Sequence, residues 1–287
     1  MTGTYHKFVV FLEMIKFSHT IFALPFALSA ALLAAGGIPT LSQTTWIILA
    51  MIGARTAAMA LNRLIDAKID AENPRTASRA LPAGLLSRSS VVFAIVLSIA
   101  LLLWAAYKLN PLCLTLSPLA LFFLVLYSYC KRFTSMAHIV LGICLAGAPV
   151  GAWIAIRGSV DPPAITLGFL VLFWVAGFDI LYALQDLGFD RERGLHSIPV
   201  RLGVQGSIWL ARVFHLITII LLVALIYQVG LGIWFSLGAL CMTGMLLYEH
   251  WLLRGGNLEK LDAAFFTMNG YISITFLLAT VLDLSLR

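Results

Sequence analysis

The sequence contains little charge. Only 11% of its 287 residues are Asp, Glu, Lys or Arg, whereas a soluble domain carries roughly 25%. Hydrophobic residues make up 61% of the chain, and the mean hydropathy is +0.97. A chain of this composition cannot cover itself with a surface compatible with water. We therefore expect an integral membrane protein.

Several common functional motifs are missing too. The four cysteines are scattered and form no CxxC pair, which argues against a zinc site or a disulfide framework. No GxSxG, Walker A or GxGxxG sequence occurs, so nothing indicates a serine hydrolase, a P-loop enzyme or a dinucleotide site. The basic residues are distributed among the loops, so the net charge of +6 does not indicate a nucleic-acid partner.

Long apolar runs dominate the chain instead. A helix needs about 20 such residues to cross a bilayer. We predict an all-α membrane protein with nine transmembrane helices in a single bundle, forming one domain over residues 1–287. The predicted spans lie near residues 17–35, 46–66, 90–108, 112–130, 136–156, 164–186, 208–228, 231–253 and 265–284.

The distribution of Lys and Arg predicts the orientation of the bundle. The N-terminus and the even-numbered loops hold 15 of these residues, and Arg55 lies inside the second predicted span. The opposite side holds only Lys108, Arg157 and Arg287. Because Lys and Arg accumulate in cytoplasmic loops, the N-terminus is predicted to be cytoplasmic.

One acidic pattern occurs twice, 120 residues apart, at the ends of apolar runs. Its two copies are Asn62, Asp66 and Asp70, and Tyr182, Asp186 and Asp190. Carboxylates four residues apart share one face of a helix, and ionisable groups near lipid are functional by default. Two facing acidic pairs offer the oxygen ligands that Mg²⁺ prefers, and Mg²⁺ binds phosphates. The pattern predicts a Mg²⁺-dependent membrane enzyme that acts on a diphosphate.

The two longest polar connections follow the two copies of this pattern. They cover about 67–89 and 187–207. Long loops beside a site often close over it, so we expect both to cap the active site.

Further candidates share the acidic faces. Arg55 precedes Asn62 by seven residues, which is about two helical turns. Asp179 extends the second copy deeper into its span, where it binds substrate or serves as a structural carboxylate paired with a neighbouring helix. We interpret Lys68 and Glu72 as solvated charges at a helix end, and we extend this interpretation to Arg63.

Basic residues near the acidic pattern suit a diphosphate, because Arg and Lys make charge-assisted contacts with phosphate. We select Arg79, Lys131 and Arg132 for this role. The other loop cations are interpreted as topology signals, and they include Arg75, Arg191, Arg193 and Arg201.

The motifs and their flanks resemble the UbiA superfamily of intramembrane prenyltransferases over residues 16–284. The matching segments are NRLIDAKID (62–70), NPRTASRALPAG (73–84), YSYCKRFT (127–134), FDILYALQD (178–186), DLGFD (186–190) and the pair Asn269 and Tyr271. The resemblance implies a polyprenyl diphosphate donor, an aromatic acceptor and a multi-pass protein of the bacterial inner membrane, surrounded by lipid, with its active site facing the cytoplasm.

By matching position, the resemblance also implies residue roles. Lys131 and Arg132 would contact the diphosphate or an acceptor carboxylate, and Tyr182 would line the cavity. Mg²⁺ would be held by Asn62, Asp66, Asp70, Asp186 and Asp190.

The implied reaction leaves an allylic carbon with cationic character after diphosphate departs, and an electron-rich ring then attacks it. Aromatic faces can stabilise such a cation. The candidates are Tyr127, Phe122, Phe123, Trp174 and Phe178. For each of them, ordinary packing is the alternative.

Two acceptors fit the resemblance. The first is a 4-hydroxybenzoate-type acid, as in ubiquinone synthesis. The segment IKFSHTIFALPFAL (15–28) looks more like relatives associated with menaquinone, which favours a dihydroxynaphthoate as the alternative. Both are aromatic carboxylates, and Arg55 and Arg132 are our candidates for binding the carboxylate.

A membrane transporter with an acidic cation site is the alternative from another class, because transporters also combine internal repeats with intramembrane acids. Three expectations favour the enzyme. The acids are predicted at helix ends, their helices are expected to be unbroken there, and the four-residue spacing suits metal binding.

Overall fold

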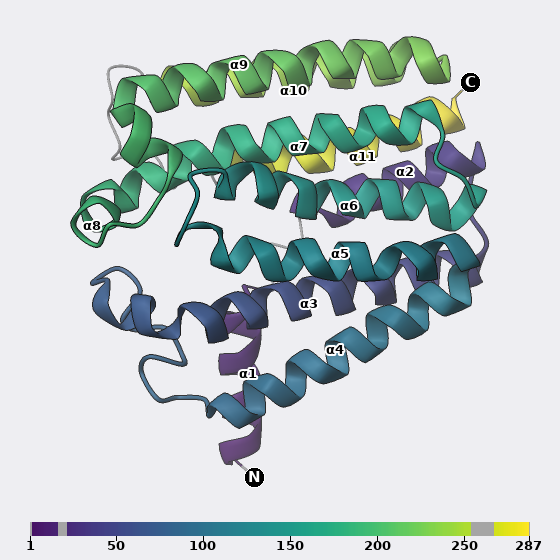
Figure 1. The fold of residues 1–287 in the computed structure, drawn as a ribbon. Helices are drawn as coiled ribbons and strands as arrows, with labels where there is room; N and C mark the ends of the chain where they lie inside the picture. The colour runs from purple at the N-terminus through teal and green to yellow at the C-terminus, as the bar shows by residue number, and fades with distance from the viewer. Residues whose placement is uncertain (1, 17–21, 254–266, 287) are drawn as a thin grey trace.

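The computed structural model describes residues 2–16, 22–253 and 267–286, and all regular secondary structure in these ranges is helical (Figure 1). The α-helices are α1 (Thr2–Met14), α2 (Leu24–Ala35), α3 (Leu41–Glu72), α4 (Arg88–Leu109), α5 (Pro111–Cys130), α6 (Ala137–Arg157), α7 (Pro162–Tyr182), α8 (Leu187–Glu192), α9 (Ile198–Val229), α10 (Ile233–Leu252) and α11 (Asn269–Ser285). A short 3₁₀ helix, η2 (Ala183–Asp186), joins α7 to α8.

Six helices in the described ranges are long and apolar enough to cross a membrane: α3, α4, α5, α6, α7 with its continuation to Glu192, and α9. Helices α2 and α11 are apolar but shorter. These helices confirm an integral membrane protein. Each predicted span overlaps a helix, although the first and last predicted spans include residues outside the described ranges. The count of nine spans stays a prediction.

Helix α1 was not predicted. It runs roughly perpendicular to α3 in Figure 1, and it contacts that helix. Its apolar residues Val10 and Met14 are buried with Ala60 of α3 and Val91 of α4 in a separate small cluster. An apolar run of this length is too short to span a bilayer, so a search for spans overlooks it.

The long helices run back and forth, and α7 lies between α6 and α9 (Figure 1). Trp174 on α7 is completely buried, and its ring centroid lies 4.9 Å from that of Phe26 on α2. Phe26 in turn lies 4.6 Å from Phe276 on α11. The Trp174 indole N–H donates to Asn269 Oδ1 at 2.8 Å, which satisfies its only polar group.

Glycine lets α6 approach α7 closely. A Cβ added to Gly142 would lie 2.6 Å from the carbonyl oxygen of Leu172 on α7. Small residues at helix interfaces permit this kind of backbone contact in membranes.

We therefore expect Gly142→Ala to lower the free energy of unfolding by about 1–3 kcal/mol, because the two backbones must separate. Gly147→Ala on the same helix is the matched control, since a Cβ there meets nothing within 4 Å. Thermal unfolding in detergent measures both. Equal unfolding temperatures for the two variants would contradict the close packing of α6 on α7.

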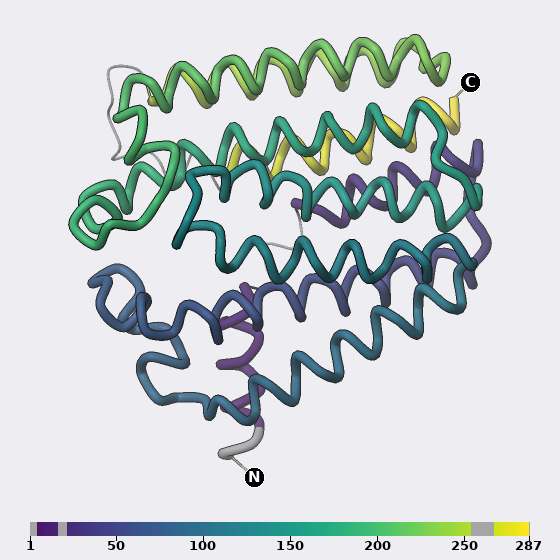
Figure 2. Tube along the Cα trace, in the orientation of Figure 1, coloured from purple at the N-terminus to yellow at the C-terminus, as the bar shows by residue number. Residues whose placement is uncertain are grey.

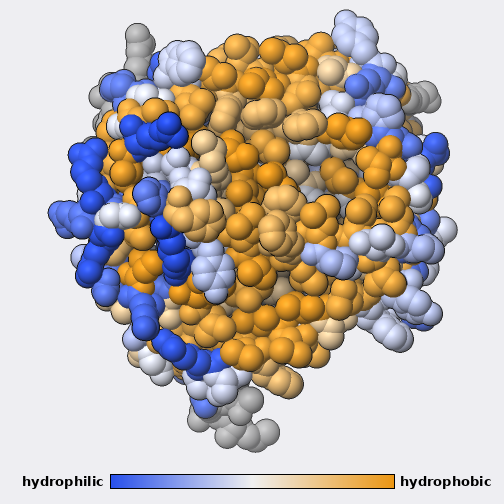
Figure 3. Space-filling view, viewed as in Figure 1, coloured by the Kyte–Doolittle hydropathy of each residue, from blue (hydrophilic) through white to orange (hydrophobic). Residues whose placement is uncertain are grey.

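Polar residues collect at one end of the bundle. The connection after α3 and helix α8 both lie at the left end in Figures 1 and 2. Hydrophilic side chains gather at this end in Figure 3, and an apolar band crosses the middle of the visible face. Lys108 and Arg157, at the ends of α4 and α6, belong to the opposite end.

Both predicted polar loops are shorter than expected. Helix α3 continues to Glu72, so the first connection begins at 73 rather than 67. Most of 187–207 is helical, because α8 occupies its start and α9 begins at Ile198. The Ser197 side chain caps α9 by accepting from the backbone N–H of Val200, and Pro199 suits the first helical turn. Helix α9 then kinks at Gly203, where φ is +67°.

Candidate active site

The two acidic segments meet at the polar end of the bundle. Asn73, which follows α3, donates from its side-chain amide to Asp186 Oδ1 at 3.0 Å. Arg75 Nε donates to the same oxygen at 2.9 Å, and its terminal nitrogen binds Asp186 Oδ2. Arg193 and Glu72 form a second bridge at 2.9 Å between α8 and the end of α3. Residues more than 100 positions apart therefore build one surface.

Asp66 is the most heavily bonded carboxylate of the first segment. It is only 3% exposed, and its Oδ2 lies 2.7 Å from Lys131 Nζ. Arg132 donates to Oδ1 at 2.9 Å, and the Asn62 amide donates to Oδ2 at 3.0 Å. Two cations from the end of α5 therefore compensate the charge of an acid buried on α3.

Asp70 lies one turn further along α3 and is 4% exposed. Its Oδ1 accepts from Arg79 at 2.7 Å, which closes the loop after α3 back onto the helix. Its Oδ2 is buried and has no hydrogen-bond partner. A buried carboxylate oxygen left in this state is costly, and it suits a ligand that brings positive charge.

The second acidic segment does not lie on one continuous α-helix, contrary to our expectation of unbroken helices. Helix α7 ends at Tyr182, η2 follows, and α8 begins at Leu187. A 3₁₀ turn has three residues rather than 3.6, so the acids of this segment do not share a simple helical stripe. Asp190 on α8 lies close to Ser197 and to the charge of Lys131.

Asp179 has the neighbouring-helix partner that a structural carboxylate requires. His138 Nδ1 on α6 lies 2.7 Å from Asp179 Oδ2. The other ring nitrogen, Nε2, accepts from the backbone N–H of Ile198 at 3.4 Å, so Nδ1 carries the proton and donates to Asp179. This contact ties α6, α7 and the start of α9 together directly beneath the site.

The cations of the site balance its acids. Asp66, Asp70 and Asp186 each bind at least one Arg or Lys side chain directly. Burial lowers the pKa of the Arg75 guanidinium, but the hydrogen bond and negative charge of Asp186 outweigh burial and raise the pKa above its ordinary value. Arg75 therefore stays charged across the physiological range.

Arg75 is a site residue that sequence reasoning missed. It was interpreted as a topology signal, yet it binds Asp186 through two nitrogens and donates to the Tyr182 hydroxyl at 3.4 Å. Its guanidinium also lies 5.7 Å from the centroid of the Tyr182 ring. Arg63 was misread too: it is buried, and it donates to the Met14 carbonyl of α1 and to Asn62. Position within the NPRTASRALPAG segment was the only sequence signal for Arg75.

Arg55 lies on α3 further from the polar end of the bundle than Asp66 and Asp70. Its terminal nitrogen donates to the Lys16 carbonyl at 2.8 Å, whereas its Nε is buried without a hydrogen-bond partner. Tyr127 on α5 lies within electrostatic reach of Asp66, Asp179 and Arg63.

The predicted aromatic candidates divide into two groups. Trp174 and Phe178 are buried and pack edge to face, with centroids 5.0 Å apart. Phe122 is 56% exposed on the outer surface of α5, so it packs towards lipid and does not face a reacting carbon. Phe123 lies against Phe122, with centroids 5.4 Å apart.

The donor set fits Mg²⁺ by its chemistry. Carboxylate and amide oxygens are the ligands that this ion prefers, and the unpartnered Asp70 Oδ2 is an acceptor open to a cation. Within residues 2–16, 22–253 and 267–286, no three Asp, Glu, His or Cys side chains gather into a metal-ligand group. The carboxylates pair with Arg and Lys instead, so binding a metal ion requires these cations to turn towards another anion.

Known proteins provide an independent comparison. The 4-hydroxybenzoate octaprenyltransferase of Aliivibrio salmonicida is 29% identical over 242 residues, which is 84% of each chain. The Vibrio cholerae protein of the same name is 30% identical over 228 residues, covering 78% of this chain and 79% of the relative.

Solved structures show the same fold. The apo structure of a UbiA homolog from Aeropyrum pernix K1 superposes with a TM-score of 0.85 at 31% identity, covering 93% of this chain and 98% of that one. A UbiA homolog from Archaeoglobus fulgidus, bound to DMAPP and Mg²⁺, has a TM-score of 0.77 at 20% identity, covering 96% and 99%. The sequence profile of the UbiA prenyltransferase family matches residues 23–271. The chain therefore belongs to the UbiA prenyltransferase family and is a membrane enzyme of the transferase class.

Proposed function

We propose that this enzyme transfers a polyprenyl group from polyprenyl diphosphate to an aromatic carboxylic acid in quinone biosynthesis. The convergence of the two acidic segments carries the proposal, because Asn73 and Arg75 beside the first segment bind Asp186 of the second. Two relatives that are 29% and 30% identical to this chain are named 4-hydroxybenzoate octaprenyltransferases. A 4-hydroxybenzoate-type acid is therefore the first choice of acceptor.

The proposal assigns a role to each group of polar residues. Mg²⁺, when bound, neutralises negative charge that develops on the departing diphosphate. It would be held by Asn62, Asp66, Asp70, Asp186 and Asp190. The cations now paired with these acids would contact the diphosphate oxygens, and they are Arg75, Arg79, Lys131 and Arg132.

Water must be kept from the allylic carbon once the diphosphate leaves. The apolar helices below the acids provide this protection, because Trp174 and Phe178 fill the core immediately beneath Tyr182 on α7. Tyr127 and Phe178 offer ring faces to the cationic carbon. The prenyl tail would run from the acids between the helices towards lipid.

Of the two candidate arginines, we assign Arg55 to the acceptor carboxylate. Arg132 is assigned to the diphosphate, because it pairs with Asp66. Arg55 Nε is a buried donor without a partner, and Arg pairs well with carboxylates. It lies about 10 Å deeper than Asn62 along α3, from seven residues at 1.5 Å each. This depth separates an acceptor from the diphosphate while keeping both on one helix.

We expect Arg55→Gln to raise KM for the aromatic acceptor about 10-fold or more, because a hydrogen bond to a charged group contributes about 1.5–3 kcal/mol. KM for the prenyl diphosphate should stay unchanged. Lys68→Gln, at an exposed position on the same helix, is the control and should alter neither constant. A rise in KM for the diphosphate alone would remove Arg55 from the acceptor site.

The proposed topology follows from the same site. We place the N-terminus and the acids on the cytoplasmic side of the bacterial inner membrane, with nine crossings in a single domain over 1–287. The connection after α3 and the α8 region, which lie within the predicted loops 67–89 and 187–207, would cap the diphosphate. Arg79 and Arg193 already bridge these segments to the end of α3.

Transfer of a labelled prenyl group by purified protein tests the proposed reaction. 4-Hydroxybenzoate and a dihydroxynaphthoate are offered in parallel, with and without Mg²⁺. Mg²⁺-dependent transfer to the first acid supports the proposal, and transfer only to the second redirects it to menaquinone synthesis. If the folded protein binds no prenyl diphosphate at all, the reaction is rejected and the transporter alternative returns.

A further inference from the structure

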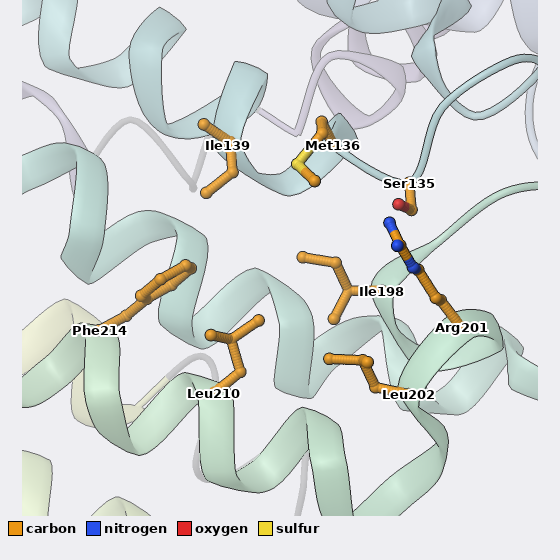
Figure 4. A pocket seen from close by; sticks show the side chains of 8 residues that line it. All are labelled: Ser135, Met136, Ile139, Ile198, Arg201, Leu202, Leu210 and Phe214. Carbon is orange, nitrogen blue, oxygen red and sulfur yellow. The ribbon is translucent and has the colours of Figure 1, made fainter.

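We propose that a cavity between the start of α6 and the first half of α9 binds an anionic phospholipid of the surrounding membrane. The cavity has a volume of about 360 Å³ (Figure 4). Its lining residues come from these two elements and the turn before α6: Ser135, Met136, Ile139, Ile198, Arg201, Leu202, Leu210 and Phe214. None of the candidate metal or diphosphate ligands lines it.

The polar groups of the cavity lie together at one side. Arg201 extends its guanidinium towards Ser135 across the cavity, as Figure 4 shows. Arg201 is exposed, and within the described residues it forms no ion pair. An unneutralised guanidinium beside a hydroxyl group provides donors for a phosphate oxygen.

The remaining lining is apolar and continues along α9. Leu210 and Phe214 follow Arg201 by nine and thirteen residues on this helix, away from its polar end. Met136 and Leu202 at the mouth are each 46% exposed, so the cavity opens on the outer surface of the bundle. A phospholipid fits both parts of the cavity, with its headgroup at Arg201 and an acyl chain along Leu210 and Phe214.

The position of the cavity selects a lipid over other anions. Arg201 lies within the first turn of α9, at the same end as α8 and the acids (Figure 1). This end is where the apolar band of Figure 3 gives way to hydrophilic side chains, which is the level at which lipid phosphates lie. A free anion would gain nothing from the apolar part of the lining.

The cavity also adjoins the candidate active site. Ile198, in its wall, donates its backbone N–H to His138, which holds Asp179. The preceding Ser197 lies close to Asp190. A bound lipid would therefore fix the start of α9, which is linked to Asp179 through His138.

Lipid binding to the purified full-length protein tests this inference without reference to catalysis. Native mass spectrometry compares phosphatidylglycerol with phosphatidylcholine of the same acyl chains. Glycerol phosphate competes as the soluble headgroup. We expect phosphatidylglycerol to bind preferentially, and we expect glycerol phosphate not to displace it.

Two substitutions probe the two parts of the cavity. Arg201→Gln removes the cation and should weaken phosphatidylglycerol binding at least about 10-fold, as expected for losing a charge-assisted hydrogen bond. Leu210→Trp fills the apolar part and should weaken binding while leaving Arg201 in place. Arg88→Gln, at an exposed cation that begins α4 at the same end, should have no effect. Unfolding temperatures without added lipid check that each variant is folded.

Three outcomes would overturn the inference. Equal binding of the two lipids would mean that Arg201 does not select charge. Unchanged binding in both Arg201→Gln and Leu210→Trp would place the lipid elsewhere. Displacement by glycerol phosphate would reduce the site to an anion contact without an acyl-chain component.

Discussion

Replacing Asp186 with Asn lowers kcat/KM for prenyl transfer by at least about 100-fold. The substitution keeps the size of the side chain but removes the charge that would hold Mg²⁺ and that now binds Arg75 and Asn73. Mutating a residue that only supports a metal ligand typically lowers metal affinity or activity about 10–100-fold. Mutating a residue proposed to hold the metal should lower activity by at least the upper part of this range. Initial rates with radiolabelled donor measure the loss.

Glu192→Gln provides the matched control. Glu192 is an exposed carboxylate two residues after Asp190, on the same short helix. The Glu192→Gln variant should retain the activity of the unmodified enzyme, because Glu192 is exposed and, among the residues that the structure describes, has no ion pair with a candidate site residue. If Asp186→Asn and Glu192→Gln had similar activity, the acid on η2 would have no special part in the reaction.

Replacing Arg75 with Ala should lower kcat/KM by about 10–100-fold, because a hydrogen bond between charged groups, here Arg75 and the diphosphate, contributes about 1.5–3 kcal/mol. Arg75 bridges both oxygens of Asp186 and contacts Tyr182, so its loss frees the acid to reorient. Arg75→Lys should retain part of the activity, because an ammonium group keeps the charge but cannot bind two oxygens in the same planar arrangement.

A control variant separates the effect of removing Arg75 on kcat/KM from the effect of removing any positive charge. Arg191→Ala removes an exposed cation of α8 and should leave kcat/KM unchanged. Combining Arg75→Ala with Asp186→Asn should cost less than the sum of the two single losses, since both side chains act on the same diphosphate. Fully additive losses would show that Arg75 works independently of Asp186.

Much of the fold was predictable because lipid leaves a backbone no partner except its own helix. Each apolar run therefore overlaps a helix, and the four-residue spacing correctly placed Asp66 and Asp70 together, buried on α3. Arg79, Lys131 and Arg132, which we selected for diphosphate contacts, lie beside these acids as ion-pair partners. Their contacts with a diphosphate stay a prediction. Local periodicity and composition were sufficient for these features.

The remaining features depend on contacts across the chain. Arg75 looked like an ordinary cytoplasmic flank because its partner, Asp186, lies 111 residues away. The sequence ALQD at 183–186 contains neither Pro nor Gly, so nothing local marked the 3₁₀ break in the second acidic segment. This break also weakens one argument used against a transporter, which assumed unbroken helices at the acids. The family match over residues 23–271 identifies the chain as a transferase without that argument.

Binding of geranyl diphosphate to the purified enzyme tests the central claim most directly, namely that both acidic segments form one metal-dependent diphosphate site. Isothermal titration calorimetry compares binding with Mg²⁺ and with a chelator, in the unmodified protein and in Asp66→Asn and Asp186→Asn. The account predicts one diphosphate per chain, bound only with Mg²⁺ and lost in either variant. Binding that persists without Mg²⁺, or that survives both substitutions, would contradict it.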